Sequence, residues 1–324
     1  MRKVLIATGG TGGHLFPAQQ LAEQLLDCEV LFAGHKLHSS PFFNRKAPSC
    51  EITSASSLRG VWALLKGTWQ SLLLLLRFAP DVVVGFGSFH TFPILLAAVL
   101  LRKKIVLFEP NCTFGKVNRW FAPFAKKVAF QFPVVHKRAV YVPLLPWKQE
   151  KKRASSKDPQ RKTILVFGGS QGAAFINQTF CEAAKYLSFP FQVIHLTGKG
   201  GQELHYTVPA MIKPFEEDMP SLYARADFAV CRCGAGTSAE LIRYNLPAVV
   251  IPYPYAHDHQ RKNGEFLGQG VRLLHQKDAT PERLAQEIEA LVAHLPQHRA
   301  ALNTLVLPNT VPLGAVVRAI GEHT

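Results

Sequence analysis

The sequence predicts two doubly wound α/β domains, each built on a parallel sheet. The first observation is that one local pattern, an apolar strand followed by a glycine-rich turn and a helix, occurs at residues 4–14 and again at residues 163–173. The second is the length of 324 residues, which suits two cores of about 150 residues each better than one. The third is that short apolar runs alternate with helix-like stretches along both halves, as in βαβ units.

The first half contains four short apolar runs that we expect to be strands buried on both faces, and therefore part of a parallel sheet. These runs are Val4–Ala7, Val30–Phe32, Val82–Val84 and Ile105–Phe108. Helices are predicted at Pro17–Leu26 and Phe92–Leu101. This alternation predicts a sheet covered by helices.

A polar and strongly basic segment, residues 148–162, is the predicted linker. It separates a first domain over residues 1–147 from a second over residues 163–307. In the second domain the strands are predicted at Thr163–Phe167, Gln192–Leu196, Phe228–Cys231 and Ala248–Ile251, and the helices at residues 171–187 and 281–295.

Basic side chains are concentrated in the first half of the chain. Residues 1–150 contain 18 Lys and Arg against 7 Asp and Glu, whereas residues 151–324 contain 19 against 15. A basic first half predicts an anionic partner, which is nucleic acid, a phospholipid surface or a phosphorylated substrate. No nucleic-acid-binding motif is present, so we expect no nucleic acid partner.

The six cysteines show no spacing typical of a zinc site, and no signal peptide precedes the first predicted strand. We therefore expect reduced thiols in a cytosolic protein. Near residue 72 the longest all-apolar run is Leu72–Leu76, far short of the roughly 20 residues that a membrane span needs.

Each glycine-rich turn can present backbone N–H groups and the start of a helix to an anion, with no side chain in the way. Neither turn continues into the Gly-Lys-Ser/Thr of a Walker motif. The first also fails as a dinucleotide fingerprint, because Leu15 stands at the third glycine position and no acid follows the second strand near Gly34. Tight turns without a ligand are the alternative. Ligand sites are favoured because open α/β sheets bind ligands at the carboxyl ends of their strands.

A third segment, Cys231–Glu240, follows a predicted strand and begins a helix at about Thr237. Backbone amides at Gly234–Gly236 can receive sugar hydroxyls or phosphate oxygens. Glu240, in the predicted first turn, can accept both hydroxyls of a ribose. The alternative is a carboxylate that only stabilises the helix start, which contributes less than about 1 kcal/mol.

The polar loop 252–263 follows the next predicted strand. A metal site made by His257, Asp258 and His259 is possible in principle. Adjacent side chains rarely converge on one ion, so we expect no metal there.

Taken in order, these motifs resemble the MurG family of peptidoglycan N-acetylglucosaminyltransferases. Each piece is weak alone, but the ordered set is specific and spans most of the chain. The pieces are Gly9–Pro17, Gly85–Ser88, Glu109–Asn111, Gly168–Ala173, Asn177, Phe215, Met219, Arg232–Glu240, His259, Gln260 and Asn263.

The resemblance implies the GT-B glycosyltransferase fold, with two Rossmann-like domains facing a cleft and a helix over residues 308–324 that returns to the first domain. It implies inverting transfer of GlcNAc from UDP-GlcNAc to the 4-hydroxyl of MurNAc in undecaprenyl-pyrophosphoryl-MurNAc-pentapeptide (lipid I), which yields lipid II. It also implies that the reaction needs no metal and no cofactor.

The resemblance also assigns the donor site. It places uracil near Phe215 and Arg232 and the ribose hydroxyls at Glu240. It places the diphosphate at the second glycine loop, at Gly169, Ser170, Gln171 and Gly172. The sugar falls near Asn111, Ala235, His259 and Gln260, and the remaining donor-site residues are Thr11, Gly12, Gly13, Gly236 and Thr237.

Inversion requires a base that removes the proton of the acceptor hydroxyl. His14 is the first candidate, because an ordinary histidine has a pKa near 6.5, and Glu109 is the second. A positioning role at the loop is the alternative for His14. The departing UDP carries about two negative charges, which loop amides and a helix start can stabilise without a metal.

Two departures from the family pattern stand out. Family members commonly carry an Arg near the donor phosphates, in a segment that here reads Val142–Trp147 and lacks one. Lys148 or the loop amides are expected to replace it. Cys112 and Gly236 also stand where the family often has other residues.

The segment 58–77 mixes two tryptophans and many leucines with Arg59, Lys66 and Arg77, as segments at a membrane surface do. The acceptor's lipid tail stays in the bilayer, so we expect a peripheral protein on the anionic cytoplasmic face of the inner membrane. The expected contacts are Val61, Trp62, Leu65, Lys66 and Trp69. A helix buried against the first sheet is the alternative, and part of Leu72–Leu76 is expected to be core.

Three other functions remain open at this stage. Another GT-B enzyme that moves a hexose from a UDP-sugar to a glycolipid would have similar donor loops. A UDP-GlcNAc 2-epimerase shares the architecture but has no use for the apolar and basic segment 58–77. A sugar-nucleotide-binding subunit is disfavoured because one chain carries both domains.

Overall fold

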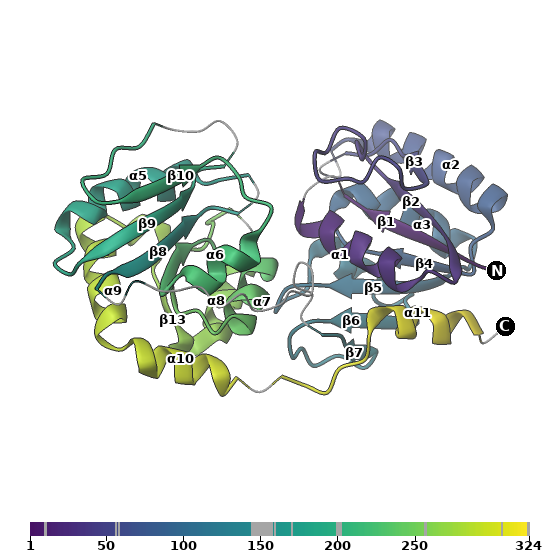
Figure 1. Ribbon diagram of the computed structural model, residues 1–324. Coiled ribbons are helices and arrows are strands. Elements are labelled where there is room, and N and C mark those ends of the chain that lie inside the picture. The colour runs from purple at the N-terminus through teal and green to yellow at the C-terminus, as the bar shows by residue number, and fades with distance from the viewer. Residues whose placement is uncertain are drawn as a thin grey trace. The chain divides into compact units, whose positions relative to one another are not determined.

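The computed structural model describes residues 1–9, 12–55, 57, 59–143, 158, 160–169, 171–198, 203–255, 258–305 and 307–322 (Figure 1). The chain divides into two compact units. Unit 1 comprises residues 1–145 and 307–324, and unit 2 comprises residues 146–306. Most of the predicted linker, 148–162, lies outside the described residues.

Unit 1 is built on a parallel sheet with the strand order β3-β2-β1-β4-β5-β6-β7. The strands are β1 (Arg2–Thr8), β2 (Cys28–Gly34), β3 (Ser49–Glu51), β4 (Val82–Gly85), β5 (Lys104–Glu109), β6 (Lys127–Phe130) and β7 (Ala139–Tyr141). The four predicted strands are the central ones. The prediction missed β3, β6 and β7, which lie at or next to the ends of the sheet.

Helices cover both faces of this sheet (Figure 1). On one face lie α1 (Gly12–Gln24) and α11 (Leu313–Glu322), and on the other lie α2 (Val61–Phe78), α3 (Phe92–Leu100) and α4 (Lys116–Phe121). Helix α1 begins five residues before its predicted start and contains Pro17.

The C-terminal helix α11 completes the α1 face of unit 1. Its apolar side joins the core through Leu313 and Val317. Its polar side is tied to the end of α1, where Arg318 donates to the Gln24 carbonyl at 2.8 Å and pairs with Asp27 at 3.2 Å. Helix α11 therefore belongs to the same core as the first strand, β1.

Unit 2 is built on a second parallel sheet with the order β10-β9-β8-β11-β12-β13. Its strands are β8 (Lys162–Phe167), β9 (Phe191–Leu196), β10 (Ala210–Lys213), β11 (Phe228–Cys231), β12 (Ala248–Val250) and β13 (Val271–Leu273). The predicted strands are β8, β9, β11 and β12, so the two that escaped prediction are the edge strands.

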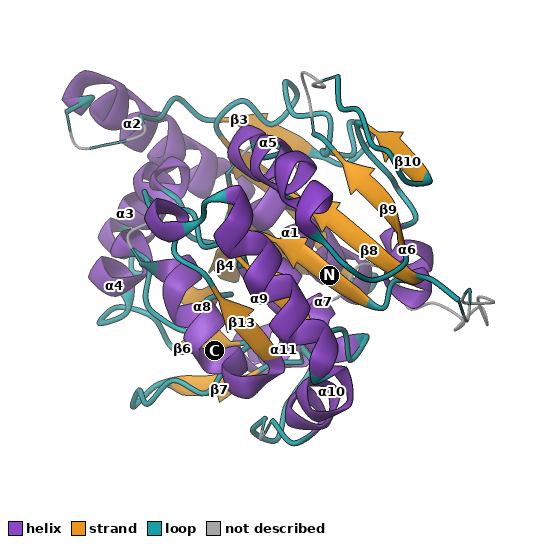
Figure 2. Cartoon of the chain, turned by 90° about the vertical axis from the view of Figure 1, so that its left-hand side faces the viewer, coloured by secondary structure: helices purple, strands orange, loops and turns teal. Residues whose placement is uncertain are grey.

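Helices again cover both faces (Figure 2). On one face lie α5 (Ala174–Ala183) and α9 (Pro281–Ala293), and on the other α6 (Met219–Arg225), α7 (Ala235–Arg243) and α8 (His259–Leu267). Helix α10 (Leu295–Asn303) contributes Leu295 to the first core and Leu302 to the second. The prediction of two doubly wound α/β domains is confirmed.

Both sheets reverse their strand order beside the first strand of the unit. In unit 1 the reversal lies between β1 and β4, where Ala7 pairs with Gly85. In unit 2 it lies between β8 and β11, where Phe167 pairs with Cys231. Ligands of open α/β sheets bind outside the carboxyl ends of strands at such points, and the glycine-rich motifs follow these four strands.

Candidate functional site

The glycine loop of unit 2 makes a tight turn between β8 and α5. Gly172 donates its N–H to the Gly169 carbonyl at 2.9 Å. Both residues have positive φ angles, of 87° at Gly169 and 76° at Gly172. A Cβ at Gly172 would lie 2.4 Å from the Thr197 carbonyl oxygen, whereas a Cβ at Gly169 would meet nothing within 4 Å. The loop is thus closed towards the sheet and open outwards at Gly169.

Two other residues of this loop are Gln171 and Ser170. Gln171 is exposed, and Ser170 lies outside the described residues. Because an open backbone turn leads directly into a helix, the geometry of this loop suits an anion, and anion binding stays a prediction.

Replacing Gly172 with alanine is expected to destabilise unit 2 by about 3 kcal/mol, because it combines a left-handed backbone with a clash against the carbonyl of Thr197. Gly169→Ala is the matched control, because Gly169 also has a positive φ but a Cβ there would meet no neighbouring atom. This substitution should cost about 1 kcal/mol. Urea unfolding of the two variants measures the difference. Equal losses would mean that the close approach at Gly172 does not matter.

A buried polar network supports the loop from behind. The Asn177 amide group donates to the Thr197 carbonyl at 2.9 Å, so its oxygen faces His195 Nε2 at 3.0 Å. That oxygen can only accept, so Nε2 carries the proton. Nδ1 of His195 then accepts from the Tyr206 hydroxyl at 2.6 Å. Burial lowers the pKa of His195 to about 4.

This histidine should contribute an acid-sensitive part to the stability of unit 2. Its pKa is about 4 when folded against 6.5 ordinarily, so between these values the unfolded chain binds a proton that the folded chain refuses. The contribution of His195 to stability is therefore lost as the pH falls from 6.5 to 4, by up to about 3 kcal/mol. In urea melts the loss of stability between pH 6.5 and 4 should be smaller in His195→Gln than in the unaltered chain, and exposed His205→Gln should leave the profile unchanged. The same pH profile in His195→Gln and in the unaltered chain would contradict the assignment.

The loop after β11 leads into α7. This helix begins at Ala235, preceded by Gly234, and no side chain caps it. A Cβ at Gly234 or Gly236 would meet nothing within 4 Å, and Gly236 is exposed. Thr237 is half-buried in the first turn. The uncapped start of α7 therefore has open space beside Gly234 and Gly236, at the carboxyl end of β11.

Glu240 lies in the second turn of α7, because the helix starts two residues earlier than predicted. The predicted position in the first turn is therefore wrong, and so is the reading of Glu240 as a carboxylate that stabilises the helix start. The Tyr223 hydroxyl donates to Oε2 at 2.6 Å, and no described residue bonds to Oε1. Burial raises the pKa of Glu240 to about 7, although the bond from Tyr223 opposes this.

Arg232 and Gln260 fasten the loop that follows β12. Buried Arg232 donates to the carbonyls of Ile251 at 3.0 Å and Pro252 at 3.3 Å, and its guanidinium lies 5.4 Å from the centre of the Tyr253 ring. Gln260 accepts from the Tyr253 N–H at 2.9 Å. Both side chains thus shape the loop itself.

Three further residues of unit 2 complete the predicted set. His259 is half-buried at the start of α8, and Phe215 is half-exposed beyond the carboxyl end of β10. Asp258 pairs with Arg261 at 3.0 Å, and His257 lies outside the described residues. In the part of the chain that the structure describes, no group of three or more His, Cys, Asp or Glu could hold a metal ion.

In unit 1, His14 lies in the first turn of α1, beside the exposed Gly13. His14 Nδ1 lies 2.7 Å from the Phe86 carbonyl oxygen. A carbonyl only accepts, so Nδ1 carries the proton and Nε2 keeps a lone pair. Burial lowers the pKa of His14. The ring is therefore neutral near pH 7 and able to take up a proton at Nε2. Gly12 begins the helix, and Thr11 lies outside the described residues.

Two more histidines stand near His14. The rings of His35 and His90 stack with centres 5.1 Å apart. Burial lowers the pKa of His90, and positive charge at His35, His14 and Lys36 lowers it further. The prediction missed this group because His35 and His90 follow β2 and β4, which are far apart in the sequence. The only signal was that each histidine comes shortly after the end of a strand.

The carboxylate of Glu109, the second predicted base, accepts hydrogen bonds from the loop that follows it. Oε1 accepts from the N–H and the side-chain amide of Asn111, at 3.2 and 3.1 Å. Oε2 accepts from the Gly115 N–H at 2.8 Å and from Asn118 at 2.9 Å. Burial still raises its pKa. Four donors leave the carboxylate little capacity for an incoming proton donor, and they fix half-buried Asn111 instead.

Helix α2 carries the predicted membrane contacts on one exposed face. The exposed fractions are 54% for Val61, 85% for Trp62, 57% for Leu65 and 64% for Trp69, and Lys66 is also exposed. Part of the predicted core run is indeed core, since Leu75 is buried, while Leu76 is exposed. Among the described residues, none of the helices has the length and apolar character needed to cross a bilayer.

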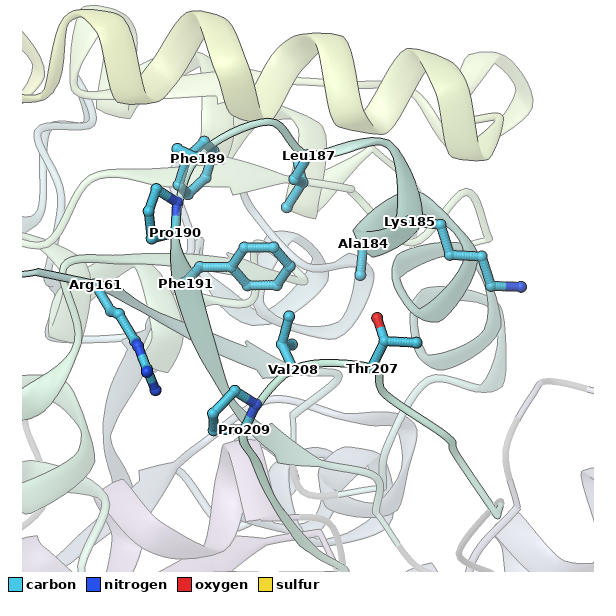
Figure 3. Close-up of a pocket in the computed structure, with 10 residues that line it drawn as sticks. All are labelled: Arg161, Ala184, Lys185, Leu187, Phe189, Pro190, Phe191, Thr207, Val208 and Pro209. Atoms are coloured by element: carbon cyan, nitrogen blue, oxygen red, sulfur yellow. The ribbon is translucent and has the colours of Figure 1, made fainter.

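Unit 2 also has a hollow of about 380 Å³ that is separate from the predicted donor site (Figure 3). Phe191 and Pro209 line it at the amino ends of β9 and β10, together with Arg161, Lys185 and Thr207. It is therefore at the opposite end of the sheet from the glycine loop. The replacement proposed for the missing family Arg, Lys148, lies outside the described residues, as do residues 144–147.

Comparison with known proteins agrees with this architecture. The N-terminal domain of glycosyltransferase family 28 matches residues 4–130, and the C-terminal domain of the same family matches residues 163–305. A solved structure, MurG from Acinetobacter baumannii, is 28% identical, with a TM-score of 0.81 and 99% of each chain covered. The expected GT-B fold is confirmed.

Two curated relatives carry the name UDP-N-acetylglucosamine–N-acetylmuramyl-(pentapeptide) pyrophosphoryl-undecaprenol N-acetylglucosamine transferase. The protein from Protochlamydia amoebophila is 38% identical, over 90% of this chain and 88% of the relative. The protein from Syntrophotalea carbinolica is 35% identical, over 91% of each. The chain therefore belongs to glycosyltransferase family 28 and, within it, to the family of these N-acetylglucosamine transferases.

Proposed function

We propose that this chain transfers GlcNAc from UDP-GlcNAc to the 4-hydroxyl of MurNAc in lipid I, with inversion at the anomeric carbon, to give lipid II. The names of its relatives support this reaction. The observation that carries the donor half is the geometry at the adjacent ends of β8 and β11. There an open glycine loop, an uncapped helix start and the carboxylate of Glu240 come from neighbouring strands.

This geometry supports the following donor roles. The ribose hydroxyls donate to Glu240, whose Oε1 is available, and the amides from Gly169 to Gly172 and at the start of α7 hold the diphosphate. Phe215 offers a half-exposed ring for uracil. We assign Arg232 and Gln260 to shaping the donor loop, while Ser170 and His259 remain expected donor contacts.

On unit 1, His14 is the proposed base. Its proton on Nδ1 is held by the Phe86 carbonyl, so Nε2 is the atom that accepts the proton of the attacking hydroxyl. Glu109 then acts as a positioning residue for Asn111 and the loop that follows it. Thr11, Gly12 and Gly13 remain expected contacts at the same loop.

The exposed face of α2 is the proposed membrane contact. Trp62, Leu65 and Trp69 lie on the same side as Lys66, a combination suited to an interface between lipid and water. We place the enzyme on the cytoplasmic face of the inner membrane as a peripheral protein, where anionic lipid attracts its basic residues.

The test is sugar transfer from radiolabelled UDP-GlcNAc to a short-chain lipid I analogue in the presence of EDTA. Labelled product at the MurNAc 4-hydroxyl would establish both the reaction and its independence of metal. Binding of UDP-GlcNAc without transfer would overturn the lipid I assignment. It would favour a transferase for another glycolipid, or the less favoured 2-epimerase.

A further inference from the structure

The carboxyl group of Glu240 is held by a side chain from another helix. The Tyr223 hydroxyl lies 2.6 Å from Oε2 and is, among the described residues, the group that hydrogen-bonds this carboxyl. Tyr223 belongs to α6, and Glu240 follows it on α7. Both residues are buried, with exposed fractions of 2% for Tyr223 and 7% for Glu240. The carboxyl is therefore fixed at one of its two oxygens.

The ring of Tyr223 is packed between two other aromatic rings. Phe167, the last residue of β8, meets it edge-on, with ring centres 5.9 Å apart and ring planes at 73°. Tyr244, directly after α7, stacks on it, with ring centres 5.0 Å apart and ring planes at 24°. Phe167 and Tyr223 belong to one core, and Tyr244 packs against it. Because interiors are close-packed, this packing fixes the position of the Tyr223 hydroxyl.

The bond to Oε2 makes the two oxygens of Glu240 different. While the Tyr223 hydroxyl donates to Oε2, a proton taken up by the carboxyl goes to Oε1, which is the oxygen available to a ligand. A protonated Oε1 would present a donor where a ligand hydroxyl needs an acceptor. An ionised carboxylate is the stronger acceptor. Hydroxyl groups of a ligand should therefore bind best to the ionised form.

The environment of Glu240 opposes ionisation, and Tyr223 favours it. Burial raises the pKa of Glu240 to about 7, and the hydrogen bond from Tyr223 lowers it. In the described part of the chain, no cationic side chain contributes to this pKa. The other titratable groups that face the pair are Tyr244 and Cys231. Burial raises the pKa of Tyr223 and of Cys231 well above their ordinary values, so Tyr223 keeps its proton and can donate it.

We propose that Tyr223 is a positioning residue for the donor, whose hydroxyl keeps Glu240 ionised and leaves Oε1 to accept from the ribose hydroxyls. The inference rests on the proposed function in one respect, that Glu240 binds the ribose of UDP. Tyr223 is buried and acts through Glu240. The preference of the site for a nucleotide with a ribose diol therefore depends on a residue that does not touch the nucleotide.

The first test measures the Kd of UDP by titration calorimetry on the full chain, at pH 7 and at pH 9. Tyr223→Phe keeps the stacked ring and removes the hydroxyl. It should weaken UDP binding about 10-fold at pH 7, because the ionised carboxylate loses a hydrogen bond that favours it. At pH 9 the carboxyl ionises without this help, so the Kd should return to within about threefold of the unaltered chain. This recovery would also show that the variant folds.

Two controls accompany this measurement. Tyr186→Phe removes a hydroxyl that donates to Glu282 at 3.1 Å in an exposed pair of unit 2, and it should leave the Kd of UDP unchanged at both pH values. The ligand 2′,3′-dideoxy-UDP lacks both ribose hydroxyls and should bind equally to Tyr223→Phe and to the unaltered chain. An unchanged Kd of UDP in Tyr223→Phe at pH 7, a loss that persists at pH 9, or an equal loss with the dideoxy ligand would overturn the inference.

A double variant separates this inference from the proposed function. If Tyr223 acts through the carboxylate, Tyr223→Phe combined with Glu240→Gln should bind UDP within about twofold of Glu240→Gln alone. Losses that add in the double variant would mean that Tyr223 acts by another route and would overturn the inference. If Glu240→Gln weakens UDP binding and Tyr223→Phe does not, only the inference fails. If Glu240→Gln leaves UDP binding unchanged, the proposed ribose contact fails as well.

Discussion

Replacing His14 with asparagine is expected to lower kcat about 1000-fold, because the reaction loses the group that removes the acceptor proton. Asparagine can still donate to the Phe86 carbonyl, so the loop keeps the bond that positions residue 14. The KM for UDP-GlcNAc should change less than threefold. Initial rates with a short-chain lipid I analogue at saturating donor measure both quantities.

The pH profile separates a base from a positioning residue. Burial lowers the pKa of His14, so the neutral and active form should predominate above a pH that lies below 6.5. The kcat of the unaltered enzyme should therefore rise through that region and then level off. In His14→Asn this acid limb should disappear from the residual rate.

Two comparison variants complete this experiment. Glu109→Gln tests the other predicted base and should keep the acid limb even if its kcat falls, because Glu109 is committed to its loop. His38→Asn changes a histidine that contacts Ser49 outside the proposed machinery and should leave kcat unchanged. If Glu109→Gln loses the limb and His14→Asn keeps it, the roles proposed for the two residues are reversed.

The central strands and the positions of the glycine loops could be predicted because they depend on local pattern. Strands such as β1 and β8 are apolar on both faces, and the loop after β8 needs glycine at Gly169 and Gly172, whose positive φ few other residues adopt. Edge strands such as β3, with the sequence Ser-Cys-Glu, show no such pattern because one side of the strand has no neighbour. Helix α8 escaped for a related reason, since its sequence is mostly polar.

The residues around the sites could not be predicted, because their partners are distant in the sequence. The Phe86 carbonyl that orients His14 is 72 positions away from it, and the Tyr223 hydroxyl on Glu240 is 17 positions away. The same limit explains Glu109. A carboxylate next to a family motif looked catalytic in the sequence, whereas its bonds to Asn111, Gly115 and Asn118 are visible only in the folded loop.

Glu240→Gln is expected to raise the KM for UDP-GlcNAc about 10- to 100-fold, because hydrogen bonds from the ribose hydroxyls to a charged group contribute about 1.5–3 kcal/mol. Glutamine keeps an acceptor for Tyr223, so the fold of α7 should be preserved. With a pKa of about 7 for the wild-type carboxyl, the donor KM of the unaltered enzyme should also rise as the pH falls below 7. In the variant the KM should be high and independent of pH in this range.

The same substitution should stabilise unit 2 at alkaline pH. The carboxyl has a pKa of about 7 when folded against an ordinary value of 4.5, so between these values the folded chain holds a proton that the unfolded chain has released. The contribution of Glu240 to stability therefore falls as the pH rises from 4.5 to 7, and the ionised buried carboxylate costs up to about 3 kcal/mol above that. Glutamine does not ionise, so Glu240→Gln should resist urea better than the unaltered chain at pH 8 and equally well at pH 4.5.

The prediction is specific because Glu240→Gln should weaken donor binding and yet increase the stability of the protein. A merely structural glutamate would lose stability and activity together when replaced, and a misfolded variant would do the same. Only a group held in an unfavourable environment for the sake of a ligand is expected to weaken donor binding while making the empty protein more stable. Glu203→Gln, at a position where the side chain is 88% exposed, should change neither property. An unchanged donor KM in Glu240→Gln would remove Glu240 from the ribose site, whatever its effect on stability.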